Sequence, residues 1–408
     1  MADLYWPGDE RAGDVFGQGA FLAAMVRVES AWLGALVRAG VAPAEADADL
    51  TGLVDEADLA GIAAGAESGG NPVLPLLDVL RERLPSDAAR GWLHRGLTSQ
   101  DAVDSALMLC GRDALARVRE EIDHQAATLA VLADRHRGTV MAGRTLTQHA
   151  VPITFGLKAA RWLDGLLDAR AGLAGVRLPA QLGGAVGTLA ATVELARLGD
   201  VAEPVKAART VAAEAANALG LDDALPWHTH RAPVTRLADA LTSATDAWGR
   251  IANDVLVLAR PEVAELAEPA GRGGSSTMPQ KANPILSVLV RRAALAGPAL
   301  AAQLHAAAAD SVDERAGGGW HVEWSALATL ARRAVVAASQ TTELLEGLEV
   351  DAARMAANAD AAASSLLAEQ GAIAERVGGE ALDTPAAYLG ASAEIIDAVL
   401  DRYRGGPA

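Results

Sequence analysis

The sequence has little of what builds a disulfide-linked, secreted or membrane-spanning protein. It contains a single cysteine, Cys110, which excludes an internal disulfide and is typical of a reducing compartment. No stretch reaches the roughly 18 uncharged apolar residues that a membrane span needs. The opening residues, MADLYWPGDERAGD, are polar and acidic and lack the basic start and apolar run of a secretory signal. We therefore expect a cytoplasmic protein with no membrane partner.

Positive charge is also scarce. Lysine and arginine together number 35, against 52 aspartates and glutamates, which gives a formal net charge of −17. Such a surface repels nucleic acid, and no basic patch along the sequence relieves that repulsion, so we expect no nucleic-acid partner. The same surface repels small anions. An anionic substrate would therefore need cations gathered inside a site.

Aromatic residues make up only 3% of the chain, and the strand formers Ile, Tyr and Phe are few. Alanine and leucine, which favour helices, are abundant, although a GC-rich coding sequence would also enrich alanine. Apolar residues recur at three- and four-residue spacing, which is typical of amphipathic helices. This spacing predicts long helices over 15–39, 101–137, 151–176, 232–266, from Pro284 onward with a kink at Pro298, and 326–348.

Long helices without intervening strands predict an all-α fold built on a long-helix bundle. At 408 residues the chain exceeds one small core. We expect three helical domains: an N-terminal domain over 1–104, the central bundle over 105–345, and a small C-terminal domain of short helices over 346–408. The segment GNPVLPL at 70–76 predicts a connector.

Two polar segments lie beside predicted helices. In HRGLTSQD, at 94–101, Thr98 and Ser99 precede a helix. They could simply cap it, or they could hold an anionic substrate at the helix N-terminus. In GRTLTQHAVP, at 143–152, four polar residues stand among apolar ones, and an ordinary surface loop is the alternative. These four are Arg144, Thr145, Gln148 and His149.

Two further segments carry potential chemistry. LPWHTHR, at 225–231, contains an H-x-H pair, but no acidic or cysteine ligand lies nearby in sequence, so we expect no metal. Arg231 is a candidate cation. GRGGSSTMPQKANP, at 271–284, breaks the helical pattern with glycines and serines. It is either an ordinary glycine-rich connection or a mobile lid that delivers hydroxyls, a lysine and free backbone amides to one point.

Taken together, these segments resemble the fumarase/aspartase superfamily over nearly the whole chain. GSSTMPQKANP is similar to its signature G-S-S-x-M-P-x-K-x-N-P at every fixed position, and TSQD and GRT…Q…P resemble its other two boxes. The resemblance implies an all-α homotetramer in which boxes from three subunits form each active site. It also implies a small anionic polycarboxylate substrate and neither a metal nor an organic cofactor.

Within the superfamily the sequence resembles the bacterial 3-carboxy-cis,cis-muconate cycloisomerases, with boxes such as TSQDAVDSAL, QLGGAVGTLA and PWHTHR. Three departures stand out. Leu146 replaces the histidine of G-R-T-H, Gln280 and Ala282 replace the histidine and arginine of H-K-R-N-P, and Ala316 follows Glu-Arg where aspartate is usual. Losing up to two positive charges from the loop opens the possibility of a different substrate.

The resemblance also implies residue roles. Ser275 matches the catalytic base, although a serine hydroxyl needs its oxyanion stabilised to act at neutral pH. His94 and His149 would transfer protons or bind carboxylates, and Arg315 is a further possible cation. Ser276 could be an ordinary loop hydroxyl. The implied substrate contacts are Thr98, Ser99, Arg144, Thr145, Gln148, Arg231, Ser276, Thr277, Met278, Lys281 and Asn283.

The expected reaction is closure of 3-carboxy-cis,cis-muconate to 4-carboxymuconolactone through an enediolate-like intermediate, as in aromatic catabolism. One alternative is a lyase that removes an amine, nitro or nucleotide group from a substituted succinate to give fumarate. A second alternative is a catalytically silent structural protein, which the intact serine, lysine and asparagine of the loop disfavour.

Overall fold

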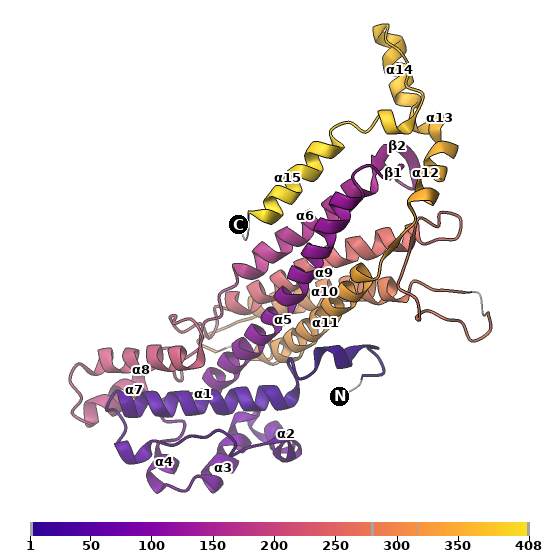
Figure 1. The fold of residues 1–408 in the computed structure, drawn as a ribbon. Coiled ribbons are helices and arrows are strands. Elements are labelled where there is room, and N and C mark those ends of the chain that lie inside the picture. The colour runs from indigo at the N-terminus through magenta and orange to yellow at the C-terminus, as the bar shows by residue number, and fades with distance from the viewer. Residues whose placement is uncertain (1–2, 279–280, 316, 406–408) are drawn as a thin grey trace. The chain divides into compact units, whose positions relative to one another are not determined.

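The computed structural model describes residues 3–278, 281–315 and 317–405 (Figure 1). Over these residues it contains fifteen α-helices and four short strands, which form two two-stranded sheets. The predicted all-α fold is therefore confirmed. Gln280 and Ala316, two of the departures noted above, lie outside the described residues.

The long predicted helices are present, with changed ends. They are α1 (Gln18–Arg38), α5 (Ser99–Arg135), α6 (Phe155–Ala174), α9 (Ala232–Leu258), α10 (Ile285–Ala309) and α11 (Gly319–Glu346). The prediction for 232–266 was too long, because α9 ends at Leu258 and the chain turns into a short strand. Pro298 lies inside α10. The connector predicted at 70–76 is partly wrong, because α3 (Val73–Arg83) already begins at Val73.

The chain divides into two compact units. One comprises residues up to 116, 176–239 and 299–333, and the other comprises 117–175, 240–298 and 334 onward. The helices α5, α9, α10 and α11 each contribute residues to both units. The division into three domains stays a prediction.

The first unit surrounds α1. Its other complete helices are α2 (Leu59–Gly69), α3, α4 (Asp87–Trp92), α7 (Ala190–Leu198) and α8 (Pro204–Leu219). Helix α1 packs against α8 and buries Trp32 and Leu33 completely. Gly111 of α5 lies so close to Leu237 of α9 that a Cβ on it would come within 2.6 Å of the leucine side chain. Small residues thus let these helices approach closely.

In the second unit, hydrogen bonds of buried polar side chains connect the helices. Gln125 of α5 accepts a hydrogen bond from the Trp248 indole of α9 and donates to the Ala338 carbonyl of α11. Trp162 of α6 donates to Asp254 of α9. Its remaining helices are α12 (Ala352–Ala361), α13 (Ala363–Leu366), α14 (Ala368–Val377) and α15 (Ser392–Arg404), and α15 packs against α6 (Figure 1).

A β-hairpin in the second unit was not predicted from the sequence. Strands β1 (Val140–Thr145) and β2 (Gln148–Thr154) pair antiparallel, with a register shift between Ala142 and Arg144. Gly143 sits at this bulge, where a Cβ would lie 2.3 Å from the Val151 carbonyl oxygen. The second sheet joins β3 (Leu266–Ala267) to β4 (Glu349–Val350).

Two helices, α1 and α10, are long and apolar enough by length and composition to span a membrane. Each nevertheless carries charges, with Arg27 and Glu29 in α1 and Arg291 and Arg292 in α10. Core helices have the same length and composition, and α1 lies largely buried within its unit.

Candidate functional site

In the first unit, Asp101 organises the TSQD box. Its fully buried carboxylate accepts the backbone N–H of Thr98, at 2.9 Å, and so caps the start of α5. It also accepts the backbone N–H groups of Gly183 and Gly184, each at 2.9 Å, and the side-chain amide of Gln181. One carboxylate therefore joins the TSQD box to the QLGG segment, which lies 80 residues further along the chain.

The electrostatics of this cluster favour protonation of the acid and a neutral histidine. Burial raises the pKa of Asp101 to about 6, against hydrogen bonds from Gln181, Thr98, Gly183 and Gly184 that lower it. The Nε2 atom of His228 lies 3.5 Å from the carboxylate, and burial lowers the pKa of this histidine. Among the residues that the structure describes, no group of three or more His, Cys, Asp and Glu side chains is arranged to hold a metal ion.

Two predicted contacts lie at the start of α5. The Thr98 hydroxyl accepts a hydrogen bond from the guanidinium of Arg315, which also donates to the Ala185 carbonyl at 3.2 Å. Arg315 is exposed, and Thr98 and Ser99 are half-buried. The three residues thus place two hydroxyls and a cation at one helix N-terminus, an arrangement suited to a carboxylate.

His94 lies just before this box in an unusual backbone conformation, with φ of 63°. Its Nδ1 atom is 2.7 Å from the Oε1 atom of Glu29, which belongs to α1 and is completely buried. Burial tends to lower the pKa of His94, and the charge and hydrogen bond of Glu29 more than offset this, so the pKa is raised.

Arg231 is enclosed by acidic side chains and is not open to solvent. It is buried, its two terminal nitrogens bind Asp104 at 2.7 and 3.0 Å, and it also donates to both oxygens of Glu323 and to the His228 carbonyl. All five N–H groups thus have protein acceptors. The predicted substrate contact of Arg231 is therefore not supported, because no donor remains for a substrate carboxylate.

In the second unit, the hairpin carries the GRT…Q box. Arg144 is held by a fork of hydrogen bonds to Glu265, at 3.1 and 3.3 Å, and Glu265 is completely buried. Thr145, Gln148 and His149 are exposed at the tip. The turn between the strands consists of Leu146 and Thr147, both with positive φ, and Leu146 is 96% exposed.

In the glycine-rich loop, two backbone N–H groups donate to the hydroxyl of Ser275. The Ser275 Oγ atom accepts the backbone N–H of Thr277 at 3.3 Å and that of Met278 at 3.1 Å. Two donors aimed at one oxygen stabilise negative charge on it, which is what a serine needs to act as a base. Ser276 and Lys281 are exposed in the same loop.

The ends of the loop are fastened together. Asn283 donates both its backbone N–H and its side-chain amide to the Gly273 carbonyl, at 2.9 and 2.8 Å. Gly273 has φ of 72°, and a Cβ on it would lie 1.9 Å from the Asn283 carbonyl oxygen. We call this pair the loop clasp. The side-chain amide of Asn283 is used in this contact within the loop. Asn283 therefore holds the two ends of the loop together, whereas the sequence had predicted that it contacts the substrate.

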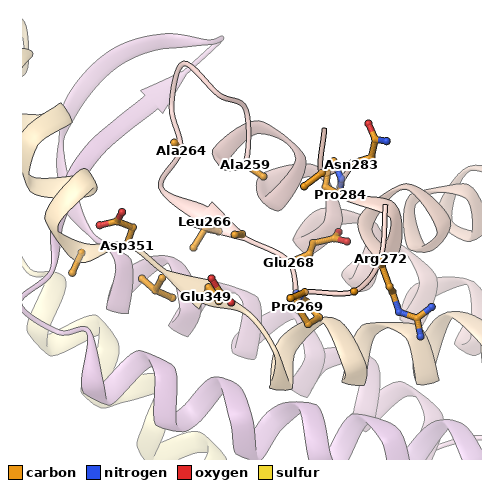
Figure 2. Close-up of a pocket in the computed structure, with 16 residues that line it drawn as sticks. Ala259, Ala264, Leu266, Glu268, Pro269, Arg272, Asn283, Pro284, Glu349 and Asp351 are labelled. Carbon is orange, nitrogen blue, oxygen red and sulfur yellow. The ribbon is translucent and has the colours of Figure 1, made fainter. Parts of the chain in front are cut away.

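A cavity of about 700 Å³ lies beside the loop clasp. Figure 2 shows Glu268, Arg272, Asn283 and Pro284 on one side of it and Glu349 and Asp351 on the other. The acidic groups are already engaged in part: Glu268 accepts the N–H groups of Leu286 and Ser287 at the start of α10, and Asp351 caps α12. The cavity is therefore lined by residues that hold the ends of the loop and the starts of α10 and α12 in place.

The predicted site residues are distributed over both units. His94, Thr98, Ser99 and Arg231 belong to the first, and the second contains Arg144, Thr145, Gln148, His149, Ser275, Ser276, Thr277, Met278, Lys281 and Asn283. Sequence reasoning missed the buried partners of these residues. The missed acids are Glu29, Asp104 and Glu323, which lie in helices, and Glu265, which lies just before β3. An acid at a helical core position is a signal that could have found the three in helices.

Comparison with known proteins agrees with the resemblance. A family model described as lyase matches residues 29–296. Nitrosuccinate lyase of Streptomyces davaonensis is 45% identical over 362 residues, which cover 86% of this chain and 75% of that enzyme. The 3-carboxy-cis,cis-muconate cycloisomerase of Pseudomonas aeruginosa is 40% identical over 379 residues, which cover 90% of this chain and 80% of that enzyme.

A solved structure agrees as well. The crystal structure of the 3-carboxy-cis,cis-muconate lactonizing enzyme from Pseudomonas putida matches with a TM-score of 0.81 and 32% identity, covering 96% of each chain. The family match spans well over half of the sequence, and the fold match spans nearly all of it. The chain therefore belongs to the lyase family, within the fumarase/aspartase superfamily.

Proposed function

We propose that this chain is a lyase that removes the nitro group from nitrosuccinate, giving fumarate and nitrite. The observation that carries the proposal is the 45% identity to a nitrosuccinate lyase over 86% of the chain. The geometry of Ser275 supports the same chemistry, because the Thr277 and Met278 amides can hold its oxyanion.

In this proposal Ser275 is the base. Its oxyanion takes a proton from the CH₂ carbon next to one substrate carboxylate, and the electron pair delocalises into that carboxylate as an enediolate. The pair then forms the carbon–carbon double bond while the carbon–nitrogen bond breaks and nitrite leaves with its electrons. The balance is nitrosuccinate to fumarate, nitrite and one proton. His94 and His149 are the proposed partners in proton transfer.

We propose substrate binding by hydroxyls, amides and cations of both units. In the first unit these are Thr98 and Ser99, with Arg315 beside them. In the second unit they are Arg144, Thr145, Gln148, Ser276, Thr277, Met278 and Lys281. We further propose a homotetramer in which three copies contribute to each site. This arrangement is supported by the exposure of Thr145, Gln148 and His149 in a single chain.

The charge of the glycine-rich loop supports a dicarboxylate in preference to a tricarboxylate. Ala282 stands where the cycloisomerase pattern has arginine, and Lys281 is exposed in the described part of the loop. Arg272, at the other end, is paired with Glu343 at 2.5 Å. Nitrosuccinate has two carboxylates and 3-carboxy-cis,cis-muconate has three, and each extra carboxylate in a closed site requires compensating charge.

The test measures both products. Purified enzyme with nitrosuccinate should release fumarate, followed by its absorbance, and nitrite, followed by a diazo colour reaction, in equal amounts. Ser275→Ala should lower kcat by about 100-fold or more, because the base is removed. Ser243→Ala removes an exposed hydroxyl from α9 in the same unit and serves as the matched control. No nitrite, or full turnover by Ser275→Ala, would overturn the proposal.

The second candidate is the cycloisomerase reaction. It is supported by the 40% identical Pseudomonas aeruginosa enzyme and by the fold match to the Pseudomonas putida enzyme. In that reaction a substrate carboxylate adds across the double bond, and Ser275 handles the proton on the carbon next to a carboxylate. Loss of the conjugated-diene absorbance of 3-carboxy-cis,cis-muconate, without nitrite release from nitrosuccinate, would favour this candidate.

A further inference from the structure

We propose that Glu29 is a positioning residue for His94: it fixes the tautomer of the imidazole and holds the ring in its working orientation. The inference rests on the proposed function only in giving His94 a task in proton transfer. The contact itself is independent of any substrate. Nδ1 of His94 and Oε1 of Glu29 are 2.7 Å apart, within the first unit.

The chemistry of the contact follows from its atoms. A carboxylate can only accept a hydrogen bond, so Nδ1 of His94 must carry the proton. The neutral ring then keeps its lone pair on Nε2, which is the form that can take a proton from a substrate or an intermediate. In other enzymes, a buried carboxylate orients the catalytic histidine in the same way.

The location of Glu29 indicates that it has this one task. It is completely buried in α1, and its second oxygen, Oε2, has no hydrogen-bond partner among the residues described. A buried carboxylate is costly, and a leucine or methionine would suit the same helix face. The acid is thus explained by its contact with His94 and by no other contact that the structure shows.

The backbone around His94 is also held in place. His94 has φ of 63°, which is uncommon for a residue with a side chain. The next residue is fixed by a hydrogen bond from the Trp32 indole to the Arg95 carbonyl, at 2.7 Å. Glu29 and Trp32 are one turn apart on α1, so a single helix supports both the ring and the chain that carries it.

Three charged groups act on the His94 ring. Glu29 and Asp101 favour the imidazolium form, and Arg81 of α3 opposes it. Removing the charge of Glu29 while keeping its shape should therefore weaken proton binding by His94. Glu29→Gln is the matching substitution, because its Oε1 can still accept the Nδ1 proton.

The experiment measures the titration of each histidine by hydrogen–deuterium exchange at ring carbon C2, read by mass spectrometry on the full-length protein. In Glu29→Gln the pKa of His94 should fall, and kcat for nitrosuccinate should drop about tenfold or more with little change in KM. The acidic limb of the pH–rate profile should move to lower pH. Glu29→Asp should recover part of the loss.

The matched control is Asp239→Asn. Asp239 also pairs with a histidine of the same unit, His305, at 2.9 Å, but the pair is exposed. This variant should leave the His94 titration and the pH–rate profile unchanged. An unchanged His94 titration in folded Glu29→Gln would overturn the inference, whether or not the enzyme acts on nitrosuccinate.

A second measurement covers the case in which Glu29→Gln does not fold. In the wild-type protein, the same exchange experiment should give His94 a pKa above its ordinary value. A value below it would overturn the inference. Because these titrations need no substrate, a failure of the proposed reaction and a failure of the Glu29 inference give different results.

Discussion

At the scale of single residues, buried charges fasten this protein's candidate site. Asp101 accepts four hydrogen bonds from two chain segments, and Arg231 donates to two carboxylates and a carbonyl. Both side chains are held by several hydrogen bonds, which offset part of the cost of burying them. These buried groups therefore fix the positions of the chain segments that they join.

Asp101 should make stability depend on pH. Its pKa is raised from 3.8 to about 6 in the folded chain, so the native state binds a proton more tightly than the unfolded state does. The stabilisation is complete below pH 4 and is lost as the pH rises through 6. Relative to Asp101→Asn, the wild-type free energy of unfolding should therefore fall by up to about 3 kcal/mol between pH 4 and pH 7.

Urea unfolding of both proteins across this pH range, at one fixed protein concentration, measures the difference. Parallel curves for wild type and Asp101→Asn would show that the carboxyl titrates normally in the folded chain.

The hairpin turn is a second residue-scale feature with a measurable consequence. Leu146 and Thr147 have φ of 48° and 71°, which side chains of these types rarely adopt. Asparagine followed by glycine is the pair that suits such a turn. Leu146→Asn with Thr147→Gly should raise the free energy of unfolding by about 1–2 kcal/mol, measured by urea unfolding. An unchanged or lower value would mean that the exposed leucine contributes packing in the assembled protein.

At the scale of elements, periodicity predicted the six longest helices and missed shorter ones such as α7 and α8. The 3.6-residue pattern located α1 and α5 within a few residues of their observed ends. It failed for the hairpin β1–β2, because that turn uses Leu-Thr in place of the usual asparagine and glycine, and α12 and α13 cover the strands. No local signal predicts such a turn, because leucine and threonine are not the residues that usually adopt positive φ.

The sequence motifs of the candidate site could be predicted, but the buried acids that bind their residues could not. The serine–glycine loop and the TSQD box can be recognised from residue order, because those residues act through local backbone geometry. Glu29, Glu265 and Glu323 lie 65 or more residues away from the residues they bind. Such pairings depend on tertiary packing, which a single sequence does not specify.

The loop clasp gives a prediction at the element scale. Gly273→Ala would place a methyl carbon 1.9 Å from the Asn283 carbonyl oxygen, so the ends of the loop must separate. Protease cleavage within 273–283 should become faster, and kcat should fall about tenfold or more because Ser275 is no longer held. Global stability should change little, since the loop is largely exposed. Gly274→Ala, whose added carbon would meet nothing within 4 Å, is the matched control for cleavage.

Equal cleavage rates for Gly273→Ala and Gly274→Ala would show that the clasp does not hold the loop. Asn283→Ala provides a separate check, because it removes only the side-chain hydrogen bond of 2.8 Å and should give an intermediate cleavage rate.

At the scale of the whole molecule, the candidate site is divided between parts of the chain. His94 and Thr98 belong to one compact unit, and Ser275 and His149 belong to the other. The residues at the hairpin tip are exposed in a single chain. The net charge of −17 repels anions, so an anionic substrate needs cations close to it. These features suit a site assembled from several copies.

Complementation between variants tests that assembly. His94→Ala and Ser275→Ala should each be nearly inactive alone. If the two residues of a site come from different copies, co-expressing the variants should restore about one quarter of wild-type activity, since each position is intact in half of the copies. Wild type co-expressed with a chain carrying both substitutions should also give about one quarter when sites are shared, but about one half when each site lies within one copy. Specific activity of the purified mixed assemblies separates these outcomes, and no recovery from the two single variants would place His94 and Ser275 of each site in the same chain.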